Sequence, residues 1–323
     1  RDDAGVEVPV MHACGHDIHV TALIGTARML ADLKGRWHGT LVLVGQPSEE
    51  KADGARALLA DGLYTRFPKP DVALALHDFS DLRAGTVGYI SGYMLAGANS
   101  VDVTIRGRGG HGAYPQMTKD PIVMAAEFIL ALQTIVSREN SPTDPAVVTV
   151  GSIHGGTKYN IIPDEVKLQL TIRTYKPEVR DRILGAVKRI ANGVAAMNGL
   201  PEDRAPIVNI SATEVTSPVY NDPALTDRLV MSLQKSLGAD NLVPLEPVMG
   251  GEDFGAYALD GRQIPTLLFR IGAIDPARMD QARSGGTPLP SLHSSAFWPT
   301  PESTIRTGVV AMTSVALDIL GTR

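Results

Sequence analysis

The outer parts of the chain alternate between short apolar runs and stretches with helical apolar spacing. Three apolar runs predict buried strands of a largely parallel sheet: 40–44, 71–76 and 265–271. Three stretches have the spacing of amphipathic helices: about 17–33, 223–237 and 301–320. This alternation is typical of an α/β domain with helices on both faces of its sheet.

The middle of the chain carries a different pattern. It predicts six elements in the order β-α-β-β-α-β, at 100–106, 120–138, 146–153, 166–173, 177–194 and 207–210. That order is typical of a ferredoxin-like sandwich. We therefore predict a mixed, mostly parallel α/β domain at 1–97 and 213–323. An inserted ferredoxin-like α+β domain at 98–212 interrupts it.

Composition and charge narrow the class of protein. The chain of 323 residues exceeds the usual size of one domain, and 44% hydrophobic residues fit a globular protein. A net charge of -5 without a Lys/Arg run argues against nucleic acid or an anionic membrane as a partner. No apolar stretch approaches the length that crosses a bilayer. The single cysteine excludes an intrachain disulfide but not an oxidising compartment. We expect a soluble protein, and the sequence leaves open whether its compartment is cytoplasmic or periplasmic.

Candidate metal ligands gather at 11–19, in Met-His-Ala-Cys-Gly-His-Asp-Ile-His, just ahead of the first predicted helix. Thiolate and imidazole are preferred ligands of zinc and of neighbouring transition metals. The segment therefore favours metal binding through Cys14 and some of its histidines, of which His12 and His19 could equally be structural. The alternative is a helix N-cap at Asp17 beside a buried cysteine.

Two adjacent carboxylates, Glu49 and Glu50, follow the run at 40–44 in Gln-Pro-Ser-Glu-Glu. Adjacent side chains on an extended backbone point to opposite sides. One carboxylate can therefore bind a metal while the other faces the water that the metal acidifies. Taken alone the pair is a weak signal, because Glu-Glu pairs are commonly solvated helix starts.

Two more histidines complete a candidate donor set. His77 follows the apolar run at 71–76, at the strand end where α/β sheets place their ligand sites, and His293 lies in a late loop. Each alone is more typical of a structural or surface histidine. Together with Cys14, His16 and a carboxylate from Glu49-Glu50, they supply about the number of donors that two metals with a shared ligand need.

Seven sequence blocks carry a resemblance to a known family over essentially the whole chain. They are Met11–Asp17, Gln46–Glu50, Ala75–His77, Gly109–Pro115, Asn160–Asp164, Met249–Phe254 and Leu292–His293. In this order they resemble the metal-dependent N-acyl amino acid amidohydrolases, which include hippurate hydrolases, bacterial aminoacylases and plant auxin-conjugate hydrolases. The resemblance implies an Asp-Met-Asp-Ala-Leu-Pro-like segment ahead of the first block. The sequence begins after that point, so we expect further residues upstream.

The resemblance also implies the metal centre and its base. Cys14 would bridge two divalent ions, which could be zinc, manganese, nickel or cobalt. The remaining protein ligands would be His16, Glu50, His77 and His293. Glu49 would act as the general base and then as the general acid.

The inserted domain would close over the site and pair two subunits, as the resemblance implies. His111 would then reach the partner's site and polarise the scissile carbonyl, while Asn160 and Arg173 would bind the substrate carboxylate. Local chemistry agrees, since Arg173 lies on the polar face of its predicted strand and a guanidinium suits bidentate binding of carboxylate. The alternatives are a surface ion pair for Arg173 and a simple turn for the glycine-flanked His111.

The sequence therefore predicts a metal-dependent amidohydrolase that cleaves N-acyl amino acids to a carboxylic acid and a free amino acid. Its partners would be this small-molecule substrate and a second copy of the chain in a homodimer or a dimer-based oligomer. Two alternatives stay open. One is a dipeptidase or carboxypeptidase with the same metal chemistry, and the other is a non-catalytic binding protein that retains the fold.

Overall fold

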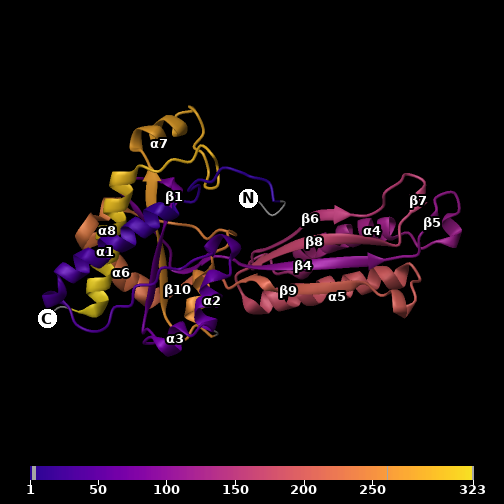
Figure 1. The fold of residues 1–323 in the computed structure, drawn as a ribbon, viewed down its shortest axis with the longest axis horizontal. Coiled ribbons are helices and arrows are strands. Elements are labelled where there is room, and N and C mark those ends of the chain that lie inside the picture. Colours follow the sequence, from indigo (N-terminus) through magenta and orange to yellow (C-terminus); the bar gives the residue numbers. More distant parts are fainter. Residues whose placement is uncertain (2–4, 260, 322–323) are drawn as a thin grey trace.

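The larger of two lobes is built on a four-stranded mixed sheet (Figure 1). The computed structural model describes residues 1, 5–259 and 261–321. The strand order is β1 (Ala73–Arg83), β12 (Thr266–Ile274), β2 (Val87–Tyr89) and β11 (Leu242–Pro244). The pairs β1–β12 and β2–β11 are parallel, and β12–β2 is antiparallel. The strands predicted at 71–76 and 265–271 are confirmed.

Helices cover both faces of this sheet. One face packs against three helices whose predicted positions are confirmed: α1 (His16–Asp32), α6 (Pro223–Leu237) and α8 (Pro301–Leu320). The opposite face packs against shorter helices: α2 (Gly54–Ala60), α3 (Leu63–Arg66) and a 3-10 helix, Asp253–Ala258. A further helix, α7 (Pro276–Arg283), projects from the lobe (Figure 1). Because side chains alternate along β12, Phe269 faces the first group and Leu268 the second.

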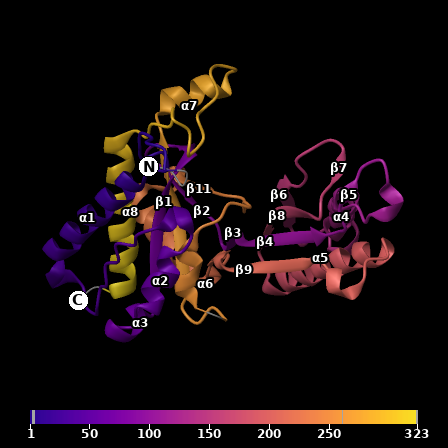
Figure 2. The same ribbon diagram turned by 45° about the vertical axis from the view of Figure 1, so that its right-hand side comes forward.

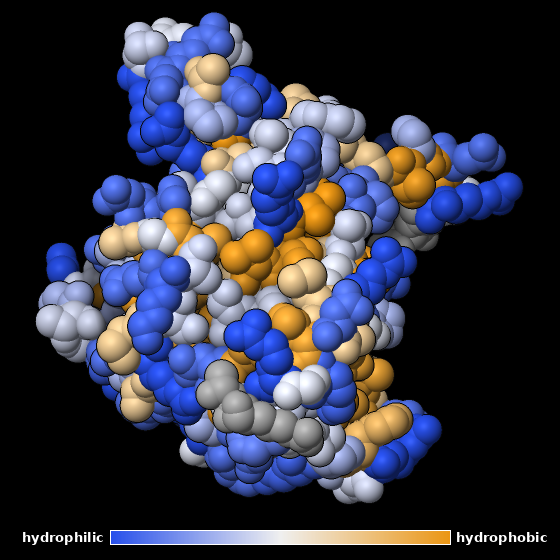
Figure 3. All heavy atoms as spheres, turned by 90° about the vertical axis from the view of Figure 1, so that its left-hand side faces the viewer, coloured by the Kyte–Doolittle hydropathy of each residue, from blue (hydrophilic) through white to orange (hydrophobic). Residues whose placement is uncertain are grey.

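The strand predicted at 40–44 is wrong. The segment is apolar, but the described residues offer its backbone no sheet partner, and Val42, Leu43 and Val44 are exposed. A strand forms only where a neighbour accepts its hydrogen bonds, which an apolar run does not itself specify. Figure 3 shows one face of this lobe, on which an apolar patch is surrounded by polar residues.

The smaller lobe is a four-stranded antiparallel sheet with two helices on one face (Figure 2). Its elements follow the predicted order: β4 (Gly97–Arg106), α4 (Pro121–Thr134), β6 (Ala146–His154), β8 (Glu165–Thr174), α5 (Pro177–Met197) and β9 (Ile207–Thr216). The sheet order is β6-β8-β4-β9. Alternation along β8 buries Leu168, Leu170 and Ile172 against the helices and leaves the other face open.

Two small two-stranded ribbons lie outside the main sheets. In the larger lobe, β3 (Gly92–Leu95) pairs with β10 (Val219–Asn221). At the far tip of the smaller lobe, β5 (Gly110–His111) pairs with β7 (Ile161–Ile162) (Figure 1). The smaller lobe therefore reaches away from the larger sheet and presents its tip to solvent.

Two helices correct the expectation that no apolar stretch is long enough to cross a bilayer. Segments Pro121–Glu139 and Pro301–Leu320 are long and apolar enough by length and composition. Both take part in packed cores, since α4 contacts α5 and the smaller sheet, and α8 contacts α1, α6 and β12. Burial in a core selects the same apolar composition as a membrane and accounts for part of their hydropathy, since 33% and 39% of the two apolar windows is buried.

Candidate metal centre and active site

Cys14 and His77 meet where α1 begins beside the middle of β1. Cys14 is buried, and its Sγ lies 3.5 Å from His77 Nε2. Gly15 turns the chain into α1 with φ +73°. A Cβ on Gly15 would lie 2.2 Å from Oδ2 of Asp78, so glycine allows α1 to approach β1 this closely.

The carboxylates Glu49 and Glu50 lie across from His16. They stand on a short 3-10 helix, Glu49–Lys51, and not on the extended strand end that the sequence predicted. His16 Nε2 lies 3.5 Å from Glu49 Oε2 and 3.7 Å from Glu50 Oε1. Glu50 Oε2 lies 3.5 Å from Nε2 of His293, whose backbone N–H donates to Ala13 O at 2.8 Å. The late loop is thus tied to the segment that carries Cys14.

These donors form overlapping sets suited to metal ions. The ligand atoms of Cys14, His16 and His77 lie within 4.8 Å of one another, as do those of Cys14, Glu50 and His293. Cys14 belongs to both triads, so its thiolate stands where one ligand could serve two ions. Thiolate, imidazole and carboxylate are the donor types that bind first-row divalent metals. The residues present therefore fit a two-metal centre.

The electrostatics of the cluster favour a bound cation. Burial, and then the charges of Glu252 and Glu50, raise the pKa of Glu49 to about 8. Burial also raises the pKa of Glu252 and that of the Cys14 thiol. Buried negative groups that repel one another hold protons until a cation replaces them. A divalent ion among these side chains would relieve that repulsion.

Asp78 is a site residue that the sequence did not reveal. Its side chain is 0% exposed, with Oδ1 3.0 Å from His19 Nε2 and 3.4 Å from His77 Nδ1. His77 Nδ1 also donates to the backbone carbonyl of Asp78 at 2.6 Å. These contacts hold the proton of His77 on Nδ1 and leave Nε2 free on the side of Cys14. Asp78 thus orients a candidate metal ligand.

Glu252 and Asp253 were likewise given no role by the sequence. Both are buried, and their carboxylates lie within 4.8 Å of Glu49. Asp253 accepts hydrogen bonds from Gln46 Nε2 at 2.8 and 2.9 Å and from the Ala55 N–H at 2.9 Å. It therefore anchors the loop that carries Glu49. Their signal was the block Met249–Phe254, in which two glycines precede two acids.

Of the three residues predicted in the smaller lobe, His111 and Asn160 lie away from this cluster, whereas Arg173 lies beside the block Met249–Phe254 that carries Glu252. Arg173 lies at the near end of β8, where its Nη1 donates to Met249 O at 3.4 Å. His111 and Asn160 lie together at the far tip, where the Gly112 N–H donates to Asn160 O at 2.9 Å. At about 3.3 Å per residue, β8 separates the two ends by roughly 26 Å. Asn160 and Arg173 thus do not meet in one chain.

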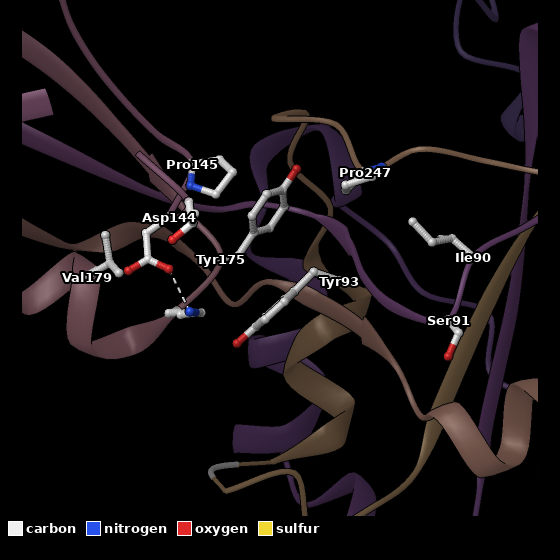
Figure 4. Close-up of a pocket in the computed structure, with 10 residues that line it drawn as sticks. Ile90, Ser91, Tyr93, Asp144, Pro145, Tyr175, Val179 and Pro247 are labelled. Carbon is white, nitrogen blue, oxygen red and sulfur yellow. Dashed lines mark hydrogen bonds and ion pairs between the residues drawn. The ribbon is translucent and has the colours of Figure 1, made fainter. Parts of the chain in front are cut away.

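A cavity of about 360 Å³ lies at the junction of the lobes, apart from the donor cluster. Tyr93 and Tyr175 form its centre, with ring centroids 5.3 Å apart (Figure 4). On its far side Lys176 Nζ lies 2.6 Å from Asp144 Oδ1. None of the residues that line this cavity is a candidate ligand, so the chemistry is centred on the cluster at β1.

An α/β lobe that brings thiolate, imidazole and carboxylate donors together beside a buried acid defines a metal-dependent hydrolase. The chain belongs to the family described as "Peptidase family M20/M25/M40", whose sequence profile matches residues 2–284. This membership confirms the resemblance to metal-dependent amidohydrolases and makes the chain an enzyme of that class.

Known proteins similar to this chain agree with that class. An N-acetyldiaminopimelate deacetylase of Leuconostoc citreum is 36% identical over 274 residues, 84% of this chain and 68% of that protein. The IAA-amino acid hydrolase ILR1-like 4 of Arabidopsis thaliana is 34% identical, over 89% of this chain and 62% of that protein. The crystal structure of the YXEP protein of Bacillus subtilis, a dinuclear metal-binding peptidase of the M20 family, has a TM-score of 0.75 at 27% identity. It covers 97% of this chain and 74% of that one.

Proposed function

We propose that this chain hydrolyses the amide bond of N-acyl amino acids to a carboxylic acid and a free amino acid. The observation that carries the proposal is the pair of donor triads that share Cys14. Two divalent ions would be held by Cys14, His16, Glu50, His77 and His293. Such ions, when bound, lower the pKa of water toward neutrality and polarise a carbonyl oxygen. The names of similar proteins, a deacetylase and an amino acid hydrolase, support this substrate class.

Glu49 would move the proton. Its carboxylate is partly buried and lies between His16 and the acids Glu252 and Asp253, so it faces the donor cluster. It would take a proton from the attacking water as the water oxygen bonds to the acyl carbon. When the carbon–nitrogen bond breaks, Glu49 would return that proton to the leaving nitrogen. Burial, and then the charge of Glu252 beside it, raise the pKa of Glu49, which would suit it to both transfers.

The candidate ligands leave the site open to substrate on one side. The side chains of Glu50 and His293 are 52% and 63% exposed, whereas Asp78 and Glu252 are buried beneath. Substrate would therefore approach over Glu50 and His293. Buried Asp78 would hold His77 at fixed orientation below.

The smaller lobe would supply substrate binding and a dimer contact. We propose that 98–212 is an inserted ferredoxin-like domain and that 1–97 with 213–323 is the catalytic domain. The β-α-β-β-α-β order and the strand order β6-β8-β4-β9 support this division. Arg173 would bind the substrate carboxylate from the near end of the lobe.

His111 and Asn160 would act on a second subunit. Both lie at the exposed tip, too far along β8 to serve the cluster of their own chain. Helix α4 supports a dimer contact, because its outer face is apolar and Leu130 is 72% exposed. In the dimer, His111 would polarise the scissile carbonyl in the partner's site, and Asn160 would bind the substrate carboxylate there.

A substrate panel tests the proposed reaction. The chelated protein would be reloaded separately with zinc, manganese, cobalt or nickel and assayed on N-acetyl and N-benzoyl amino acids and on matched dipeptides. We expect metal-dependent release of free amino acid, with N-acyl amino acids as the better substrates. Faster cleavage of dipeptides would make the chain a dipeptidase. No hydrolysis by any metal-loaded form would reject the proposal.

A further inference from the structure

Arg270 is a buried cation on the floor of the site. It lies on β12 directly beside His77 of β1, and it is 7% exposed. Paired residues on parallel strands project to the same face of a sheet. Ala75 and Leu268 are also paired, and each lies two positions before His77 or Arg270 on its own strand. Both pack against the 3-10 helix that follows Glu252, so this face of the sheet is turned toward that helix. The side chain of Arg270 therefore shares the face of His77.

The guanidinium of Arg270 has no polar partner among the residues that the structure describes. Its Cζ lies 3.8 Å from the centroid of the Phe79 ring, but no described side chain or carbonyl accepts from its nitrogens, and no carboxylate lies within 4.0 Å. A guanidinium has five N–H donors. None of the Arg270 nitrogens is among the wholly buried polar atoms that lack a partner, so these donors keep access to the space around them. Stacking on a ring uses the face of the group and leaves its N–H edges available.

The charges nearest to Arg270 connect it to the site. Among these charges Glu252 has the largest electrostatic effect on it, followed by Asp81 on the same strand as His77, and then by Asp78 and Cys14. Among the described residues Glu252 forms no ion pair with Arg270 within 4.0 Å, and one of the Glu252 carboxylate oxygens accepts from the Phe254 N–H at 3.1 Å. Burial lowers the pKa of Arg270 to about 10, so the side chain remains a cation at neutral pH. A guanidinium without an ion-pair partner beside the candidate metal ligands is suited to bind an anionic group of the substrate.

We propose that Arg270 is a specificity-determining residue that binds a carboxylate at the acyl end of the substrate. This rests on the proposed function, in which Arg173 of the smaller lobe binds the carboxylate of the amino acid half. Arg270 belongs to the sheet of the larger lobe, so it would contact the acyl half of the substrate. The substrate class would be N-acyl amino acids whose acyl group ends in a carboxylate, as a succinyl group does.

The test compares N-succinyl-leucine with N-acetyl-leucine. In metal-loaded wild type we expect kcat/KM to favour the succinyl compound by about tenfold or more, the size of one charged hydrogen bond. Arg270→Met should remove that preference, mainly by raising KM for N-succinyl-leucine, while hydrolysis of N-acetyl-leucine stays within about threefold. Phe79→Leu should lose part of the preference, because the ring holds the guanidinium. Arg306→Met, which changes an exposed arginine in a surface ion pair, should behave as wild type.

Calorimetry with succinate and acetate measures binding without turnover. Weaker binding of succinate by Arg270→Met than by wild type would support the proposal for Arg270, whether or not the amides are hydrolysed. If neither amide were hydrolysed, only the proposed amide hydrolysis would be rejected. Equal losses for both amides in Arg270→Met would overturn the proposal and give Arg270 a structural role. A preference for N-acetyl-glutamate over N-acetyl-glutamine that depends on Arg270 would also overturn it, because the anion would then belong to the amino acid half.

Discussion

The larger lobe gathers its candidate residues into one cluster, whereas the smaller lobe places its own at opposite ends. In the larger lobe, donors from segments as distant as Cys14 and His293 lie within 4.8 Å of each other. In the smaller lobe, Arg173 and His111 lie at the two ends of an antiparallel sheet. Among the candidate ligands only His77 lies on a strand, and the start of α1, a short 3-10 helix and a late loop bring the other donors to it. The antiparallel strand β8 instead carries Arg173 near one end and leads to the tip at the other.

This difference would assign metal binding to the larger lobe and contacts with a second subunit to the smaller lobe. The metal centre can be complete within one chain, so its loss should remove activity whatever the oligomeric state. In the proposed function the tip residues would act on a metal centre in another chain, so their contribution should depend on dimerisation. The predictions that follow test this division, beginning with the largest effect.

Replacing Glu49 with Gln should lower kcat by roughly a hundredfold to ten-thousandfold, because the amide cannot move the proton. Metal content, measured by elemental analysis, should stay at the wild-type value. Glu302→Gln, at an exposed surface carboxylate, serves as the control. If Glu49→Gln kept more than about a tenth of wild-type turnover, another group would be the base.

Replacing His111 with Ala should lower kcat by about a hundredfold, the usual effect of one group that stabilises an oxyanion. Mixing His111→Ala with Glu49→Gln after subunit exchange should then restore activity. In a mixed dimer the chain with intact Glu49 receives His111 from its partner, which makes one of the dimer's two sites complete. With about half of all dimers mixed, about a quarter of all sites become complete. If mixing restored nothing while mixed dimers formed, His111 would not act between subunits.

Replacing Asp78 with Asn should weaken metal binding by about tenfold to a hundredfold, because Asp78 orients His77. The affinity can be measured by competition with a chromogenic chelator. Asp81→Asn changes an exposed carboxylate on the same strand and should leave the affinity unchanged. Equal effects of the two substitutions would mean that overall charge, and not orientation of His77, governs the affinity.

The smallest effect is expected in the core of the smaller lobe. Ile172→Val should lower the free energy of unfolding by about 0.5–1.5 kcal/mol, because Ile172 is fully buried there. Urea denaturation measures this loss. Metal affinity should not change, since the substitution lies outside the donor cluster. A parallel loss of metal affinity would show that the lobes are coupled more tightly than the site geometry implies.

The fold was largely predictable where local patterns decide it. The period of apolar residues located α1, α6, α8 and the order of elements in the smaller lobe, because each pattern reflects the face that an element buries. The run at 40–44 failed because pairing is a non-local property. Likewise, the 3-10 helix at Glu49–Lys51 depends on the loop that Asp253 anchors, 200 residues away along the chain.

The candidate site was predictable in its donor types but not in its supporting residues. Cys14, His16, Glu50, His77 and His293 are notable in the sequence because metals prefer their side chains. The roles of Asp78 and Arg270 depend on burial, and burial follows from how α1 and β12 pack against β1. Neither residue lies in a pattern that predicts a buried charge, so only the structure could reveal them.

The central claim is that Cys14 joins two metal positions, and anomalous diffraction tests it most directly. Crystals of the full chain would be grown with zinc, and data collected on both sides of the zinc absorption edge. We predict two anomalous peaks per chain, both next to the Cys14 sulfur, one near His77 and the other near His293. Peaks that lie away from Cys14, or no peak within the cluster, would contradict the account.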